Sequence, residues 1–171
     1  MTSPQTITSK TPNKLHNNLL LLVLFGIALQ FFGVLYEGLV YGPKLLDTSL
    51  DRMLFWKSFF SVISPLIYYV PLVYIATLLL LVLYFKTPKQ NPQLKKTIAK
   101  ASIFQLVALA LTIYIIAQLN FKAAFSNLET YAAIIPQKVI LFNILSVIRI
   151  AFAAAALSYT FKAYLQTQKI N

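Results

Sequence analysis

The sequence predicts an all-α membrane protein, an antiparallel bundle of four transmembrane helices with a further helix lying in the membrane interface in its first outer loop. Hydrophobic residues make up 58% of the 171 positions and charged residues only 11%, with a mean hydropathy of +0.71. A soluble domain carries charge on about a quarter of its residues. Four long apolar segments each offer the roughly 20 residues that a helix needs to cross a bilayer core. These observations together indicate a multi-pass membrane protein.

The predicted spans cover residues 18–40, 63–85, 101–120 and 139–161. They form one membrane domain, residues 17–165, because the length suits a single compact unit. Residues 1–16 are polar and contain proline, so we expect a disordered cytoplasmic tail there. Residues 166–171 are expected to form a cytoplasmic C-terminal tail. The first apolar run is too long for a signal peptide and no small-residue cleavage site follows it, which favours a retained helix.

The cations between the apolar segments predict which side of the membrane each end faces. Nine lie in the N-terminal tail, the second loop and the C-terminus, against five in the first and third loops. Because cytoplasmic loops carry the excess of Lys and Arg, both termini and the second loop are expected in the cytoplasm. The bilayer is expected to be the plasma (inner) membrane, and its lipids are the first predicted partner.

Two of the connecting segments have distinct compositions. Residues 50–62 read LDRMLFWKSFFSV, an aromatic and apolar sequence with two embedded cations. Trp56 is a residue typical of the headgroup level, so we expect an interfacial helix here. Residues 86–100 are rich in Pro, Gln and Lys, which predicts a short solvated connector whose lysines lie near anionic headgroups.

One face of the first predicted helix carries small and polar residues. They follow one another at steps of three or four, which keeps them on one helical face: Gly26, Gln30, Gly33, Glu37, Tyr41 and Lys44. The other faces consist of Leu, Val, Phe and Ile. Since lipid favours apolar side chains, this stripe is expected to face protein, and its glycines allow another helix to approach closely.

The fourth predicted helix carries a second stripe, which contains an arginine. Its members are Ser146, Arg149, Ala153, Ala156 and Thr160, with Asn143 near its edge. Arg149 follows Lys138 by eleven residues, about 16 Å of helix, and so lies near the membrane midplane. An arginine at that depth costs at least about 2.5 kcal/mol. Glu37 is the best candidate partner, because the two side chains lean toward each other from antiparallel helices.

Two interpretations of this pair stay open. The first is a buried ion pair that fixes which helix faces meet. The second is a partly hydrated pocket in the outer half of the membrane that holds a small molecule, an ion or a lipid headgroup, because intramembrane charges commonly mark functional sites. The residues assigned to such a ligand site are Glu37, Arg149, Gln30, Asn120, Asn143 and Tyr41.

The composition excludes several kinds of chemistry. With no cysteine, the chain has no disulfide, thiolate nucleophile or Cys-ligated metal, and its one histidine, His16, lies in the N-terminal tail. All four glycines lie in or just after the first span, so a glycine-rich phosphate loop is absent. The net charge of +11 does not indicate nucleic acid, because the cations sit between apolar runs. We expect no cofactor and no metal site, and no catalytic residue can be assigned.

Three segments of the membrane portion resemble a known family. They read GVLYEGLVYGPKLLD (33–47), AQLNFKAAF (117–125) and FNILSVIRIAFAAAAL (142–157). With Asn120 closing the third helix, and Asn143 and Arg149 in the fourth, they resemble the anthrone oxygenase-like family of small four-helix membrane proteins. The resemblance implies a compact antiparallel four-helix bundle. It does not bring oxygenase activity with it, because no base or cofactor site is visible in the chain.

Three functions stay open at this point. A bundle that binds a small molecule or lipid predicts an outer cavity around Glu37 and Arg149. A structural or partner subunit of a membrane complex predicts a packed core, no ligand and a membrane-protein partner. A cofactor-independent oxygenase-like enzyme predicts a closed apolar pocket with a few polar groups, and an enzyme is less favoured than a non-enzyme.

Overall fold

All regular secondary structure in the described part of the chain is helical. The computed structural model describes residues 14–62, 66–119 and 132–169, and its regular elements there are all helices. The four long helices are α1 (Lys14–Tyr36), α4 (Leu66–Lys86), α5 (Pro92–Tyr114) and α8 (Ile135–Gln168). The shorter ones are η1 (Glu37–Tyr41), α2 (Gly42–Leu45), α3 (Leu50–Val62) and η2 (Ile115–Leu119), of which η1 and η2 are π-helical. The prediction of an all-helical fold is confirmed.

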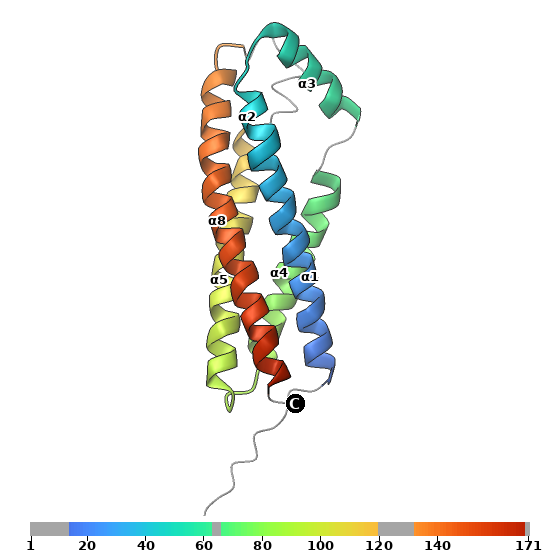
Figure 1. Ribbon diagram of the computed structural model, residues 1–171, viewed down its shortest axis with the longest axis vertical. Coiled ribbons are helices and arrows are strands. Elements are labelled where there is room, and N and C mark those ends of the chain that lie inside the picture. The colour runs from blue at the N-terminus through green and yellow to red at the C-terminus, as the bar shows by residue number, and fades with distance from the viewer. Residues whose placement is uncertain (1–13, 63–65, 120–131, 170–171) are drawn as a thin grey trace, which may run out of the picture.

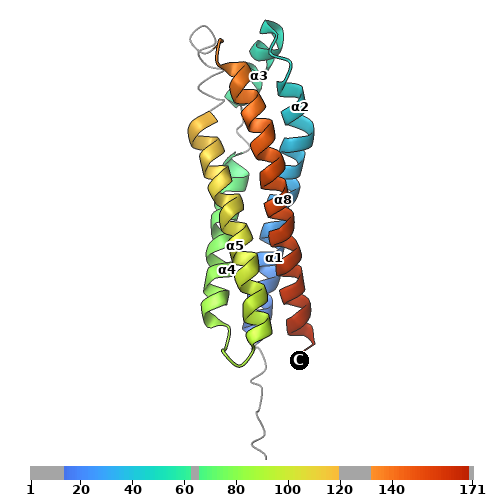
Figure 2. The ribbon, with the colours of Figure 1, turned by 90° about the vertical axis from the view of Figure 1, so that its left-hand side faces the viewer.

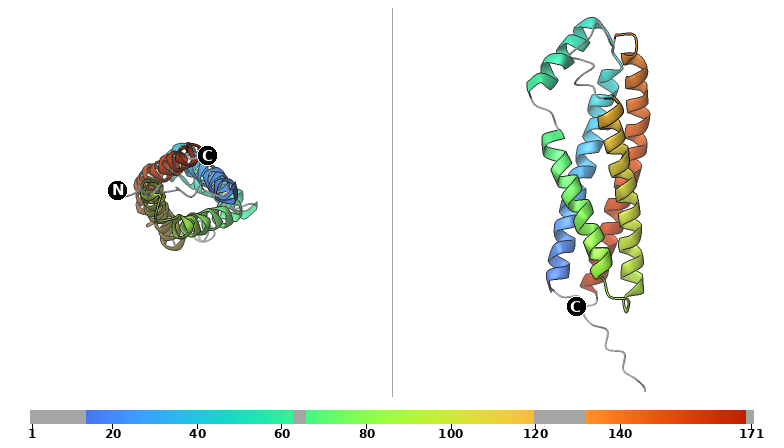
Figure 3. Two further views of the ribbon diagram at one scale, coloured as in Figure 1. Left: turned by 90° about the horizontal axis from the view of Figure 1, so that it is seen from below. Right: turned by 180° about the vertical axis from the view of Figure 1, so that it is seen from behind.

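The four long helices lie side by side along the longest axis of the molecule (Figure 1). Helix α1 contacts α4 and α8, and α5 contacts the same two helices, so the four are arranged in a ring. Each runs in the opposite direction to the one before it, as the colours show (Figure 2). Helix α3 lies across one end of this ring, here named the α3 end, and the turn at residues 87–91 lies at the other, here named the turn end (Figure 3).

Three helical segments are long and apolar enough to cross a membrane. They are Leu15–Leu45, Pro92–Leu119 and Ile135–Gln168. In α4 the apolar segment is shorter, Pro71–Lys86. Large apolar side chains on the outside of all four long helices are exposed, including Phe25, Phe85, Ile103 and Val147. Such a continuous apolar exterior is typical of a protein surrounded by lipid.

The helices extend further toward the turn end than the hydropathy pattern indicates. Helix α1 begins at Lys14, inside the segment expected to be disordered, while residues 1–13 lie outside the described residues. Helix α5 begins at Pro92, so most of the predicted connector is helical; proline suits a first helical turn because its missing N–H has no partner to lose there. Helix α8 continues to Gln168. Hydropathy marks where a helix meets lipid, whereas polar residues can continue the same helix into water.

Helix α3 coincides with the segment predicted to be an interfacial helix. Its Trp56 is buried and packs into an apolar cluster at the α3 end. The other members of this cluster are Leu45, Ile115, Leu119, Ile135, Val139 and Phe142. Before the helix, hydrogen bonds from the hydroxyl and the backbone N–H of Ser49 lower the pKa of Asp47, and Arg52 pairs with the same carboxylate at 3.4 Å. These contacts position α3 over the ends of the long helices.

The core nearer the turn end is apolar and tightly packed. It consists of Leu, Ile, Val and Ala side chains from all four long helices, including Leu20, Leu80, Ile98 and Ala156. Gly26 permits close approach of α1 to α4, because a Cβ at this position would lie 3.0 Å from the Cβ of Ala76. At its rim, Lys95 lies 5.1 Å from the ring of Tyr84 and Lys100 lies 5.4 Å from that of Tyr159, within cation–π range.

Candidate functional site

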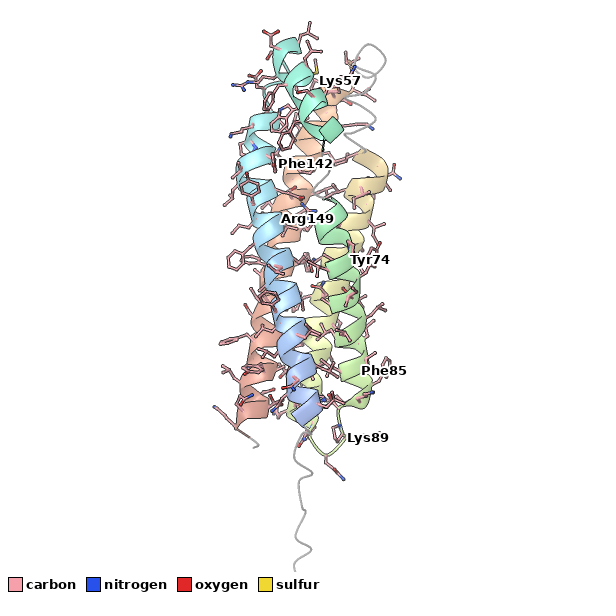
Figure 4. The ribbon with its side chains drawn as sticks, turned by 90° about the vertical axis from the view of Figure 1, so that its right-hand side faces the viewer. Lys57, Tyr74, Phe85, Lys89, Phe142 and Arg149 are labelled. Atoms are coloured by element: carbon pink, nitrogen blue, oxygen red, sulfur yellow. The ribbon has the colours of Figure 1, made fainter. Side chains whose placement is uncertain are left out.

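An ion pair joins α8 to the segment that continues α1. The Nη2 of Arg149 donates to Oε2 of Glu37 at 2.6 Å, so the predicted pairing is confirmed. The Arg149 side chain is 3% exposed and that of Glu37 is 18% exposed. Figure 4 shows Arg149 between the helices, nearer the α3 end than Tyr74 and further from it than Phe142. Two opposite charges are therefore held together inside a largely apolar molecule.

A π-helical turn begins at Glu37 itself. In η1 the N–H of Gly42 donates to the carbonyl of Glu37, five residues earlier, where an α-helix would use a partner four residues earlier. The predicted stripe is buried at Gly26, Gln30 and Gly33 and mostly buried at Glu37. Beyond Glu37 the extra residue per turn moves the inward face forward by one position. Gly42 and Leu45 are consequently buried there. Tyr41 is half-buried and packs against the cluster under α3, so the predicted face is wrong only at its last position, Lys44, which is exposed.

Asn143 holds this π-helical turn in place. Its Nδ2 donates to the carbonyl of Gly42 at 3.0 Å and to that of Val139, on its own helix, at 2.9 Å. A Cβ on Gly42 would collide with the Asn143 amide, so only glycine permits this approach. The Asn143 side chain, assigned to a ligand site from the sequence, thus has a structural role with both amide hydrogens in use.

A second polar layer lies two helical turns from the ion pair. The Nε2 of Gln105 donates to Oε1 of Gln30 at 2.6 Å and to Oγ1 of Thr77 at 3.0 Å, and all three residues are buried. The small apolar cluster of Val34, Ala108 and Ala153 separates this layer from the ion pair. Gln30 is therefore bonded to Gln105 on α5, which also bonds to Thr77 on α4.

The remaining predicted site residues are placed differently. Tyr41 is half-buried, with its ring 5.6 Å from that of Trp56 and 5.2 Å from that of Tyr36, so it belongs to the aromatic contacts under α3. Asn120 lies outside the described residues. Of the six residues assigned from the sequence, the structure thus brings together Glu37 and Arg149, and Asn143 lies six residues before Arg149 on α8.

Ser146 lies on the same face of α8, and sequence reasoning did not assign it to the site. Helical serine and threonine hydroxyls commonly donate to a backbone carbonyl three or four residues earlier. In the described helices this is seen for Ser58, Thr77, Thr97, Ser102, Thr112, Ser158, Thr160 and Thr167. The hydroxyl of Ser146 is fully buried and forms no hydrogen bond within the described structure, and the same holds for Nε of Arg149. No periodicity in the sequence could have distinguished Ser146 from the other hydroxyls.

The acidic and histidine side chains of the described residues do not gather in any group of three that could hold a metal ion. The site consists instead of one carboxylate, one guanidinium and one hydroxyl. Such a set can bind a polar group through hydrogen bonds and charge, while the apolar clusters on either side exclude water.

Comparisons of the chain with protein-family models, with curated proteins and with solved structures find no match. The resemblance to the anthrone oxygenase-like family therefore stays an expectation. The chemistry of the site has to be interpreted from its own residues.

Proposed function

We propose that the protein is a multi-pass membrane protein with four antiparallel transmembrane helices, which binds a small molecule or a lipid beside Glu37 and Arg149. Three of the four helices have the length and hydropathy of a span. The fourth, α4, has 21 residues, about 31 Å of helix, against a bilayer core of about 30 Å. It contacts α1 and α5 in the ring, and its outward side chains, such as Ile75 and Leu78, are exposed and apolar. A helix in that position shares the lipid surroundings of its neighbours.

We propose the plasma (inner) membrane as the location, and the charge distribution supports cytoplasmic termini. Among the described residues, lysines near the turn end outnumber those near the α3 end, and the side facing the cytoplasm carries such an excess. Under this orientation α3 lies at the outer interface, and the pair of Glu37 and Arg149 lies in the outer half of the bilayer.

The observation that carries the binding proposal is the state of the Arg149 guanidinium. An arginine side chain has five N–H donors in a fixed fork. In the described structure Arg149 is nearly fully buried, yet its Nε has no hydrogen-bond partner. Leaving a buried donor unpaired costs about 1–3 kcal/mol. A bound molecule with an acceptor atom removes that cost, which supports a ligand at this position.

Native mass spectrometry of the purified protein tests this proposal. We expect the wild type to retain a small molecule or lipid that the double variant Glu37→Gln/Arg149→Met loses. The control is Lys44→Gln, which removes an exposed cation near the same end and should leave the retained molecule unchanged. A wild type without any retained molecule, or a double variant that keeps it, contradicts the proposal.

The second candidate function is a structural or partner subunit without a ligand. It is favoured by the short direct contact of 2.6 Å between Glu37 and Arg149, since each charge already has an opposite charge beside it. In that case the pair fixes how α8 meets the first helix, and the protein contributes a preformed surface to a larger membrane complex. A folded double variant with the same mass spectrum as the wild type would favour this alternative.

A further inference from the structure

Two hydrogen-bond donors on one face of α8 lack acceptors in the described structure. Ser146 and Arg149 are three residues apart, which places their Cβ atoms about 5–6 Å from each other on the helix surface. The Ser146 hydroxyl is 0% exposed and does not donate back to its own helix, as the other described helical hydroxyls do. The Nε of Arg149 is buried and unpaired. Both groups thus present unused donors to the same layer of the molecule.

The room beside these donors is limited on the α1 side. A Cβ added to Gly38 would lie 3.7 Å from the Cβ of Ser146 and would also contact the side chain of Ile150. The absence of a side chain at Gly38 allows the helical segment that begins at Glu37 to lie directly against Ser146. The part of a ligand that reaches both donors therefore has to be small, such as one carbonyl or hydroxyl oxygen of its head.

The charge of this layer is balanced without a ligand. Arg149 contributes one positive charge and Glu37 contributes one negative charge. Among the described charged residues, Lys44 is the nearest in the sequence to Glu37 and Lys138 is the nearest to Arg149, and both lie toward the α3 end. Lys44 is exposed, and Lys138 donates to the carbonyl of Gln118 at 3.1 Å. Adding a charged head to a balanced pair in an apolar interior leaves a net charge that is expensive to bury. An uncharged head adds hydrogen bonds without that cost.

We propose that the ligand is an uncharged amphiphile whose polar head accepts hydrogen bonds from the Ser146 hydroxyl and from Nε of Arg149. The inference rests on the proposed function and names the class of ligand. A carbonyl or hydroxyl oxygen on an apolar body meets these requirements, as in a neutral glycerolipid. Glu37 then keeps Arg149 oriented and neutralised while the Nε and the hydroxyl hold the head.

A matched pair of probes separates a neutral head from an anionic one. Monooleoylglycerol and its phosphate ester, the oleoyl lysophosphatidate, share the chain and the glycerol and differ in the phosphate. Each is titrated onto the purified full-length protein, and the bound fraction is followed by native mass spectrometry. We expect the wild type to bind monooleoylglycerol at least about tenfold more tightly than the phosphate ester, because the latter adds an unbalanced charge.

Two single substitutions test the role of the hydroxyl. Ser146→Ala removes the unpaired hydroxyl and should weaken monooleoylglycerol binding by roughly three- to tenfold, the effect of one hydrogen bond. Ser102→Ala is the control, because its buried hydroxyl is already bonded to the carbonyl of Ile98 at 2.9 Å. It should leave the affinity unchanged. Ser146→Ala is expected to fold, since the hydroxyl makes no bond within the described structure.

The outcomes distinguish this inference from the function on which it rests. Equal or tighter binding of the phosphate ester, or unchanged monooleoylglycerol binding by Ser146→Ala, overturns the uncharged head. So does the absence of binding by both probes. If the wild type nevertheless retains a molecule that Glu37→Gln/Arg149→Met loses, the binding function stands with a different ligand class. If nothing is retained, both proposals fail.

Discussion

At the scale of single residues, the ion pair between Glu37 and Arg149 joins two opposite charges that are both largely buried. Burying either charge alone would cost free energy, and the opposite charge of its partner offsets that cost. Their separation of 2.6 Å and low exposure distinguish them from the pair of Asp47 and Arg52, whose side chains are 55% and 61% exposed. Interaction energies of exposed pairs are reduced by solvent, so the two pairs form a natural comparison within one chain.

A double-mutant cycle measures the coupling of the buried pair. Glu37→Gln and Arg149→Met should each lower the free energy of unfolding by about 3–5 kcal/mol, because each leaves one charge buried without its partner. The double variant should lose much less than the sum of the two. Thermal unfolding in detergent, followed by circular dichroism, gives the four values.

The control cycle uses Asp47→Asn and Arg52→Met, for which we expect weak coupling because both side chains are more than half exposed. Additive losses at Glu37 and Arg149 would show that the ion pair does not form in the folded protein. Arg149 would then need a different acceptor.

At the scale of elements, the π-helical turn η1 sets the register of the inward-facing residues near the α3 end. It begins at Glu37, so it fixes where the carboxylate emerges from the helix. It also brings Gly42 rather than Tyr41 against Asn143 on α8. π-Helical turns inserted in α-helices are often found at functional sites. Here the same π-helical turn contains Glu37 of the ion pair and leads into α2, which contacts α8.

Two glycine substitutions in this segment should differ in cost. Gly42→Ala places a methyl group on the Asn143 amide, which two hydrogen bonds hold in position, and should lower the free energy of unfolding by about 1–3 kcal/mol. Gly38→Ala meets the end of the flexible Ile150 side chain, which can rotate away, and should cost less. Denaturation of both variants and the wild type in the same detergent provides the comparison. A larger loss for Gly38→Ala would contradict the described packing of Asn143 against the π-helical turn.

At the scale of the whole molecule, the ring of four antiparallel helices separates two chemically different ends. The turn end carries lysines that lie over Tyr84 and Tyr159, and the α3 end is closed by an aromatic helix around Trp56. Figure 4 places Lys57 and Lys89 at these opposite ends. In a membrane, the two ends would face different compartments.

The absence of cysteine makes this topology directly testable. Lys57→Cys and Gln90→Cys each introduce a single thiol at an exposed position, and neither removes a lysine from the expected cytoplasmic side. A membrane-impermeant maleimide added to intact cells should label Lys57→Cys, and it should label Gln90→Cys only after the membrane is permeabilised. Labelling of both positions in intact cells would contradict the proposed four spans.

Much of this architecture could be predicted from the sequence, because partition into lipid depends on local composition. Four apolar segments indicated the four long helices, and residues 50–62 were predicted as the helix that is now α3. The stripe from Ser146 to Thr160 is buried as expected. An arginine inside the membrane needs an acidic partner. Because the chain has few other acids, this requirement identified Glu37. The orientation stays a prediction of the charge pattern.

Other features depended on contacts between helices, which no local pattern contains. The ends of α1, α5 and α8 lie beyond the apolar segments because helical hydrogen bonding continues past the lipid boundary. The π-helical turn η1 is stabilised by Asn143, a residue 101 positions away from Gly42, so a regular 3.6-residue period misplaced Lys44. Gln30 is bonded to a partner on α5 instead of lying in the ion-pair layer.

Composition and periodicity thus determined which segments are helical and which charges have to meet. Only the tertiary structure decided the register of those helices and the unpaired donors of Ser146 and Arg149, because both depend on which atoms the neighbouring helices bring within hydrogen-bond distance.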